Sequence, residues 1–113
     1  MSYDDALAER FRKELRGVRD VSEKKMMGGL CVLVNGSMIG GIDRTKAGED
    51  RFMFRVGKAN EAAALARPGA SIVEMGGKRL GGFVFVDAKA CERTALKGWV
   101  AMAFGYVKTL PKK

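Results

Sequence analysis

The pair Asn35-Gly36 constrains the fold of this chain more than any other feature of its sequence. Asn-Gly is the strongest short signal for a two-residue β-hairpin loop, because a type I′ turn needs positive φ at both central residues. An apolar, β-prone segment, residues 30–34, precedes the pair, and a second one, residues 38–42, follows it. We therefore expect these segments to pair as antiparallel strands, with Gly40-Gly41 marking a bulge or a close packing contact.

The glycines between residues 26 and 41 raise a second interpretation, a phosphate-binding loop. Neither of the common nucleotide-binding patterns, GxxxxGK[ST] or GxGxxG between a strand and a helix, is present. Gly28-Gly29 precede an expected strand, so no helix N-terminus would meet a phosphate there. The hairpin is the better interpretation of this stretch.

The N-terminal segment predicts an amphipathic helix over about residues 3–16. Ser2 is the expected N-cap and Asp5 the N3 partner of a capping box, and Gly17 stands where a helix C-cap is expected. Basic residues late in this helix complement its dipole and need no ligand. The stripe expected to face the core is Leu7, Phe11 and Leu15.

The remaining elements follow from alternation, helix propensity and turn residues. In residues 51–56, Phe52, Phe54 and Val56 alternate with Arg51, Met53 and Arg55, which is typical of a half-buried strand. A helix is expected over residues 58–67, then strands 71–75 and 83–86, and a final helix over about 92–108 whose apolar stripe is Leu96, Trp99, Val100, Ala103 and Val107.

This order of elements, helix, three strands, helix, two strands, helix, defines the expected fold class. It predicts a two-layer α+β fold in which a five-stranded antiparallel sheet packs against helices. The length of 113 residues suits a single domain over residues 1–113. No apolar run approaches the roughly 20 residues of a membrane span. The acidic start of the chain lacks the apolar core of a secretory signal, so we expect a cytoplasmic protein without membrane contact.

The residue types argue against several kinds of chemistry. The chain has no histidine, which removes Ser-His and Cys-His catalysis and the commonest zinc ligand. Cys31 and Cys91 form no CxxC pattern, and we expect an inert core thiol at Cys31 and an unreactive one at Cys91. Glu74 and Asp87 are expected on the surface rather than as an acid/base pair. No catalytic residue, metal or cofactor is expected, and the chain is not expected to be an enzyme.

Charge is the main sequence feature that points to a partner. Twenty-one basic and 13 acidic residues give a net charge of +8, which favours anionic partners but also serves solubility. Lys78-Arg79 stand in the segment GGKRLGG, which predicts a flexible hairpin tip that either reaches a phosphate backbone or is simply solvated. The candidate anion- or partner-binding residues are Lys24, Lys25, Arg51, Arg55, Lys78 and Arg79.

The segment KKMMGGLCVLVNGSMIGGI resembles the hallmark of TfoX N-terminal domains. The later segments RFMFRVGKAN, GGKRLGGFVFVD and LKGWVAMAFGYVKTLPKK resemble those of small, free-standing family members, so the resemblance covers the chain from about Ser22 onward. Met27 stands where the family usually has Phe, and Cys31 where Gly is common. The residues that match the hallmark are Lys25, Met26, Met27, Gly28, Gly29, Asn35, Gly36 and Met38.

The resemblance implies a fold and a direction for function. The fold would be the secretion-chaperone-like α+β arrangement, a helix-flanked antiparallel sheet. The function would be that of a small non-enzymatic module that modulates transcription or competence, the role of the regulator TfoX, through protein or nucleic-acid binding. The alternatives are a protein-interaction or chaperone-like domain without nucleic-acid contact, and an enzyme of unrecognised type. The partner is unknown, and a homodimer is left open.

Overall fold

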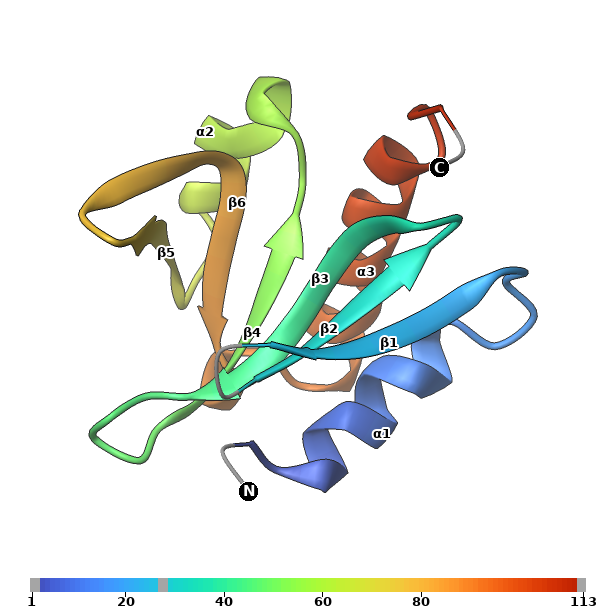
Figure 1. The fold of residues 1–113 in the computed structure, drawn as a ribbon. Coiled ribbons are helices and arrows are strands. Elements are labelled where there is room, and N and C mark those ends of the chain that lie inside the picture. Colours follow the sequence, from blue (N-terminus) through green and yellow to red (C-terminus); the bar gives the residue numbers. More distant parts are fainter. Residues whose placement is uncertain (1–2, 27–28, 112–113) are drawn as a thin grey trace.

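The structure is an antiparallel sheet with α-helices packed on one of its faces (Figure 1). The computed structural model describes residues 3–26 and 29–111, and within them the sheet has six strands in the order β1-β2-β3-β4-β6-β5. The elements are α1 (Asp5–Glu14), β1 (Val21–Met26), β2 (Gly29–Val34), β3 (Ser37–Arg44), β4 (Asp50–Arg55), the 3₁₀ turn η1 (Lys58–Asn60), α2 (Glu61–Leu65), β5 (Ala70–Met75), β6 (Lys78–Asp87), the 3₁₀ turn η2 (Ala88–Ala90) and α3 (Arg93–Val107). The expected α+β class is confirmed.

The hairpin predicted around Asn35-Gly36 is confirmed. Asn35 has φ 54° and Gly36 φ 79°, which is the positive-φ pair that a two-residue type I′ turn requires. Strands β2 and β3 pair in register from Leu30 opposite Ile42 to Val34 opposite Ser37, with an irregularity after Val32. A Cβ on Gly40 would stand 2.2 Å from the Met53 carbonyl oxygen, so the expected close contact at this glycine is also present.

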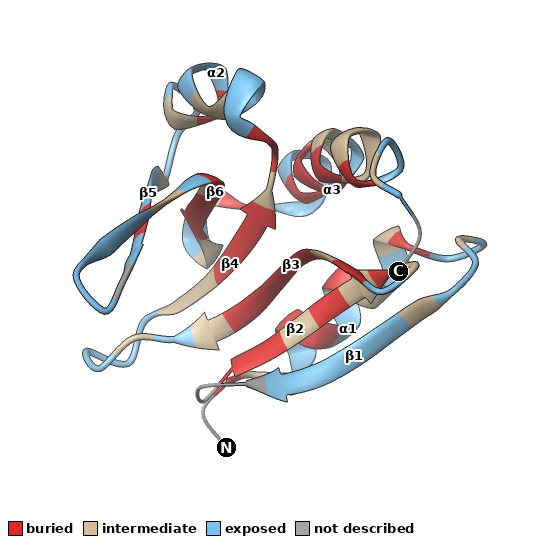
Figure 2. Cartoon of the chain, turned by 45° about the horizontal axis from the view of Figure 1, so that its top comes forward, coloured by how far each residue is buried: buried red, intermediate tan, exposed pale blue. Residues whose placement is uncertain are grey.

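The prediction of five strands is wrong, because residues 21–26 form an additional strand, β1. This strand lies at the edge of the described sheet and pairs with β2, from Val21 opposite Val34 to Met26 opposite Gly29. Its residues from Ser22 to Lys25 are exposed, so the sequence carries no alternation of buried and exposed positions that could reveal a strand (Figure 2). Charged edge strands of this kind discourage pairing with other chains.

Helix α1 is shorter than predicted at both ends. It begins at Asp5, and the N-cap is Asp4, whose carboxylate accepts a hydrogen bond of 2.9 Å from the Ala6 amide. The capping box was therefore placed wrongly, and Ser2 lies outside the described residues. The helix ends at Glu14 with Leu15 as C-cap, rather than at Gly17. The predicted core stripe is confirmed, because Leu7, Phe11 and Leu15 are all buried.

The loop between β5 and β6 is also shorter than predicted. Only Gly76-Gly77 form the turn, with φ 58° and 78°, and β6 begins directly at Lys78, opposite Met75. The early start of β6 was not predictable from the sequence, because the glycines at 81–82 are typical of a loop. In the structure they lie inside the ten-residue strand β6. Gly82 has φ +84°, and β6 bends strongly along its length (Figure 1).

Four aromatic rings join the helices to the sheet. Phe11 of α1 lies 5.7 Å from Phe54 of β4, and Phe54 stacks on Trp99 of α3 at 5.4 Å with an interplanar angle of 5°. Phe52 lies 5.9 Å from Phe54, and all four side chains are at most 2% exposed. Aromatic pairs at such distances contribute about 0.5–1.5 kcal/mol beyond the area they bury. This cluster is therefore the centre of the core, and the predicted core positions of α3 are confirmed.

We predict that Trp99→Ala lowers the free energy of unfolding by about 3–5 kcal/mol, because it removes a large buried side chain and the stacking partner of Phe54. The measurement is urea unfolding followed by circular dichroism. Lys97→Ala, at an exposed position of the same helix, is the matched control and should change stability by less than about 0.5 kcal/mol. A loss below about 1 kcal/mol for Trp99→Ala would contradict the central role of the ring.

A bidentate ion pair fastens the edge strand β1 to helix α1. The Arg12 guanidinium donates to both carboxylate oxygens of Glu23, at 2.6 and 2.7 Å, and also contacts Glu9 at 2.6 Å. The hydrogen bonds from Arg12 lower the pKa of Glu23 below its usual value. Ionised Glu23 is therefore stabilised in the folded chain relative to the unfolded chain.

We predict that Glu23→Gln lowers the free energy of unfolding by about 0.5 kcal/mol at neutral pH, the range for partly exposed pairs. Because the folded-state pKa is depressed, the contribution of Glu23 is complete above its unfolded pKa of about 4.3 and is lost as the pH falls through the folded value. Urea unfolding of both proteins across the acid range tests this. A difference that persists at the acid end, where both side chains are neutral, would contradict the ion pair as its cause.

Candidate functional site

The candidate site lies on the face of the sheet opposite the helices, which the described helices do not cover. Strand residues alternate between faces, and the alternation predicted for β4 is confirmed. Phe52 and Phe54 are fully buried beneath the helices, whereas Arg51 and Arg55 are half-buried on the helix-free face. Met53 lies on the helix-free face between these two arginines.

A second, smaller apolar cluster stands on this helix-free face. Its buried members are Met53, Val73 and Phe85, all at most 9% exposed, and among the described side chains the residues that pack in it come from strands β3 to β6. The bend of β6 places the first half of this strand and β5 at an angle to the rest of the sheet (Figure 1). The face is therefore concave rather than flat. The half-buried members are Met38, Leu80 and Phe83.

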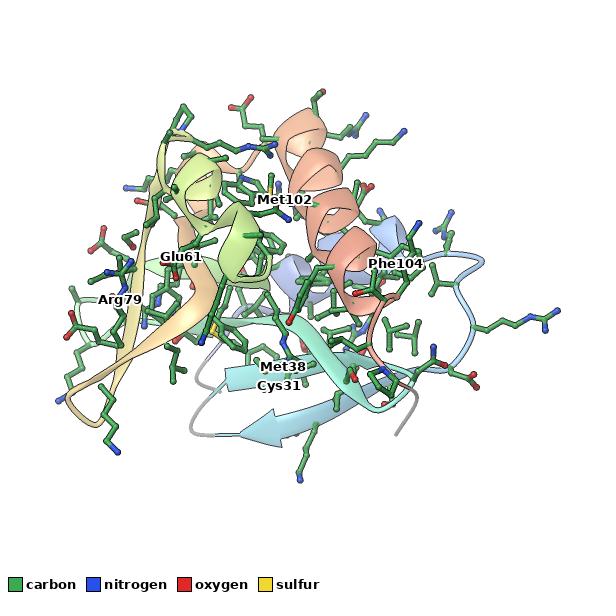
Figure 3. All side chains as sticks on the ribbon, turned by 90° about the horizontal axis from the view of Figure 1, so that it is seen from above. Cys31, Met38, Glu61, Arg79, Met102 and Phe104 are labelled. Carbon is green, nitrogen blue, oxygen red and sulfur yellow. The ribbon has the colours of Figure 1, made fainter. Side chains whose placement is uncertain are left out.

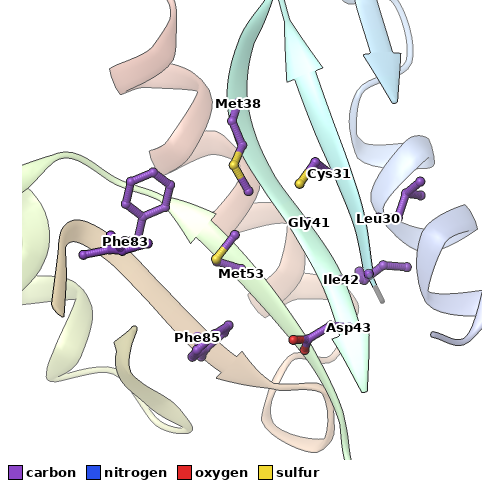
Figure 4. Close-up of a pocket in the computed structure, with 11 residues that line it drawn as sticks. Leu30, Cys31, Met38, Gly41, Ile42, Asp43, Met53, Phe83 and Phe85 are labelled. Carbon is purple, nitrogen blue, oxygen red and sulfur yellow. The ribbon is translucent and has the colours of Figure 1, made fainter. Parts of the chain in front are cut away.

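This concave face encloses a hollow of about 200 Å³, which we call the apolar basin. In Figure 4, the side chains of Met38, Met53 and Phe83 converge on the hollow from three different strands. Methionine side chains are flexible and polarisable, so such a lining can adapt to a bound apolar group. The lining residues are Gly29, Leu30, Cys31, Met38, Gly41, Ile42, Asp43, Met53, Leu80, Phe83 and Phe85.

Arg51 contacts two residues that line the apolar basin, Asp43 and Phe85, and carries little available charge. Its guanidinium forms a bidentate pair with Asp43, at 2.7 and 3.1 Å, and its Cζ lies 3.5 Å from the centre of the Phe85 ring. The Asp43 carboxylate balances the positive charge, and the ring occupies one face of the guanidinium. Arg51 is thus satisfied within the fold.

Arg55 stands at the end of β4 and lines a second hollow of about 370 Å³. Its Cζ lies 5.6 Å from the Phe83 ring and 5.7 Å from the Tyr106 ring. Phe83 lines both hollows. We call this second hollow the cationic pocket; it is lined by Arg55, Gly57, Lys58, Ala59, Gly81, Gly82, Phe83 and Tyr106.

Glycines build the wall of the cationic pocket. The amides of Val56 and Gly57 both donate to the Gly82 carbonyl, at 2.8 and 3.0 Å, which brings the end of β4 against the bend of β6. Gly57 has φ +88°, and a Cβ there would lie 2.5 Å from the Tyr106 ring. Only glycine fits this close approach.

The structure separates most of the predicted site residues. Lys24 and Lys25 are both exposed on β1, but Lys24 stands opposite Cys31 on the helix-free face and Lys25 opposite Leu30 on the helix face. The three strands β2, β3 and β4 separate the residues of β1 from those of β6. The six residues therefore do not form one patch, and their role in anion binding stays a prediction.

Lys78 and Arg79 directly follow the Gly76-Gly77 turn of the β5-β6 hairpin, so they stand near its tip as predicted, but within strand β6 rather than in a flexible loop. They are the first two residues of β6, and Arg79 pairs with Glu61 of α2 at 2.8 Å (Figure 3). The second Glu61 oxygen accepts the Gly82 amide at 2.7 Å, so this carboxylate connects α2 to the bend of β6. Lys78 is exposed beside the Gly76-Gly77 turn.

Lys58 is the site residue that sequence reasoning missed. It lies at the start of η1 and lines the cationic pocket together with Arg55. The sequence offered only one weak signal, a single cation that opens an alanine-rich segment, and helix propensity explained that segment without it. The approach of η1 to the bend of β6 is a tertiary contact that local patterns do not contain.

The two thiols lie in different environments. Cys91 is fully buried, and burial raises its pKa to about 11. Cys31 was expected in the core, but it is half-buried and lines the apolar basin; its pKa is raised by burial, with a smaller opposing effect from Lys24. Glu74 and Asp87 do not meet, because Glu74 stands opposite Arg79 and Asp87 opposite Arg51.

Neither a metal centre nor a membrane-spanning helix is present in the part of the chain that the structure describes. Among residues 3–26 and 29–111, no three or more His, Cys, Asp or Glu side chains stand close enough to hold a metal ion together. Within the same residues, none of the helices is long and apolar enough to cross a membrane.

One family model matches the chain, that of the TfoX N-terminal domain, over residues 13–105. No curated protein and no solved structure matches it. The matched stretch runs from the last part of α1 into α3, so it contains the whole sheet and every residue that lines the apolar basin.

We predict that a thiol reagent such as Ellman's reagent modifies one cysteine per native chain, at Cys31, because Cys91 is fully buried with a raised pKa. The rate should increase as the pH rises toward the raised pKa of Cys31. Absorbance of the released thiolate measures the reaction, and Cys31→Ser should abolish it until denaturant exposes Cys91. Rapid modification of two thiols in the native protein would contradict the described burial.

Proposed function

This chain belongs to the TfoX N-terminal domain family, and we propose that it is a non-enzymatic module that binds a partner protein in the apolar basin. The observation that carries the proposal is the apolar cluster on the helix-free face, where half-buried Met38 and Phe83 and buried Met53 line an open hollow. Contiguous apolar surface with a polar border is typical of interaction sites rather than of plain solvent-exposed sheet.

The distribution of charge supports a protein partner over nucleic acid. Non-specific binding to nucleic acid depends on many Lys and Arg contacts along the phosphate backbone. Here Arg51 and Arg79 are already held in ion pairs, and Lys24 and Lys25 point to opposite faces of β1. These four candidate cations therefore do not form a continuous stripe of available charge.

The residue chemistry supports a non-enzymatic role. The chain lacks histidine, and burial raises the pKa of both thiols, which disfavours the reactive thiolate. The acidic side chains near the apolar basin have structural partners: Asp43 holds Arg51, and Glu61 holds Arg79 and the Gly82 amide. None of them is left as a general acid or base.

A binding module of this kind suits the role that the family resemblance implies. Modulation of transcription or competence needs recognition of another macromolecule and no chemistry of its own. Direct binding of nucleic acid is the alternative, and crosslinking distinguishes a protein partner from a nucleic-acid partner.

The test is photo-crosslinking in the native cell. We expect p-benzoylphenylalanine in place of Cys31, inside the apolar basin, to capture one defined protein. The matched control is the same residue in place of Ala101, an exposed position of α3, which should capture none. Leu80→Glu, which adds a charge to the basin lining, should remove the adduct without unfolding the chain. Adducts with nucleic acid only, or equal capture from both positions, would contradict the proposal.

A further inference from the structure

We propose that the partner segment is acidic, and that its carboxylate binds in the cationic pocket while a neighbouring apolar side chain enters the apolar basin. This inference rests on the proposed function, because it names the chemistry of the partner bound at the same face. It also assigns binding residues, Arg55 and Lys58, of which only Arg55 was recognisable in the sequence.

The two hollows are neighbours on the sheet, because they share a lining residue. Phe83 lines both of them, and Arg55 reaches over the ring of Phe83 with its Cζ 5.6 Å from the ring centre. A ligand that fills the apolar basin therefore meets a guanidinium as soon as it extends past Phe83. One apolar group and one anionic group, adjacent in the ligand, match this arrangement.

The charges in the cationic pocket are not neutralised within the fold. No carboxylate of residues 3–26 or 29–111 forms an ion pair with Arg55 or Lys58. The nearby carboxylate of Glu61 has both oxygens engaged, one with Arg79 and one with the Gly82 amide. The contrast with Arg51, which is paired with Asp43 on the same face, singles out Arg55 as the arginine with capacity to bind an anion.

The cationic pocket is also held in shape before any ligand arrives. The rings of Phe83 and Tyr106 position the Arg55 guanidinium, and the contacts of Val56 and Gly57 with the Gly82 carbonyl fix the glycine wall. Binding to a preformed site loses less conformational entropy than binding to a mobile one. A carboxylate can accept two parallel hydrogen bonds from a guanidinium, which adds geometric selectivity.

The pairing of one apolar hollow with two cations favours an acidic protein segment over other anions. A nucleic-acid backbone would need further cations in line, and Arg51 and Arg79 are occupied. Asp or Glu beside Leu, Met or Phe supplies both required groups within a few residues of one chain. The partner is thus expected to present a short acidic segment with a large apolar side chain.

Two fluorescent probes with the same rings test the two hollows separately. The first, 1-anilinonaphthalene-8-sulfonate, carries an anion, and the second, N-phenyl-1-naphthylamine, does not. We expect the unmodified protein to bind the anionic probe about two- to fivefold more tightly, the range for a partly exposed ion pair. Arg55→Met and Lys58→Met should each reduce this preference and leave the binding of the neutral probe unchanged. Lys46→Met, at an exposed loop position, is the matched control and should change neither.

The outcomes separate the two proposals. If both probes bind with equal affinity and the variants do not change either affinity, the cationic pocket does not bind anions and the present inference is wrong. The proposal that the apolar basin binds a partner would remain. If neither probe binds, the proposal that the apolar basin is a binding site is wrong.

Crosslinking to the cellular partner tests the cationic pocket directly. We expect p-benzoylphenylalanine in place of Ala59, which lines this pocket, to capture the same protein as p-benzoylphenylalanine at position 31. The captured peptide should contain Asp or Glu next to a large apolar residue; a neutral or basic peptide, or nucleic acid, would overturn the inference.

Discussion

The stacked rings of Phe11, Phe54 and Trp99 are the contact on which the rest of the structure depends. They connect α1, β4 and α3, so both long helices must pack on the same face of the sheet. A sheet covered on one face only leaves the other face to water or to a partner. The helix-free face of this sheet nevertheless carries half-buried apolar side chains, Met38 and Phe83 among them. One-sided packing is thus the physical origin of the candidate site.

The bend of β6 converts the uncovered face into a site with two parts. Gly82 permits the bend, and its carbonyl binds the amides that end β4, which brings Lys58 and Arg55 to the same pocket. The first half of β6 then limits the apolar basin on one side. The basin offers apolar burial and the adjoining pocket offers unpaired positive charge. A partner that satisfies both is more specific than one that satisfies either alone.

Local physical chemistry in the sequence determined a large part of this fold. Asn35-Gly36 requires a tight turn whatever surrounds it, since few residues adopt positive φ at low cost. The stripes of α1 and α3 and the alternation of β4 identified the core correctly, because burial follows the period of each element. The hallmark around the hairpin also indicated the family that the family model shows. The edge strand β1 was not predicted, because its exposed residues do not show the alternation of apolar and polar positions that marks a half-buried strand.

The candidate site depended on tertiary structure, for a different reason. Whether a cation is available to a ligand is decided by its neighbours, and these come from distant parts of the chain: Glu61 for Arg79, and Tyr106 for Arg55. The sequence marked Arg55 and Arg79 as equivalent candidates, but only one of them is free of an ion pair among the described residues. The sequence by itself thus determined the elements, their buried faces and the sign of the charge. Tertiary structure alone decided where the charge remains available, because long-range contacts have no local period in the sequence.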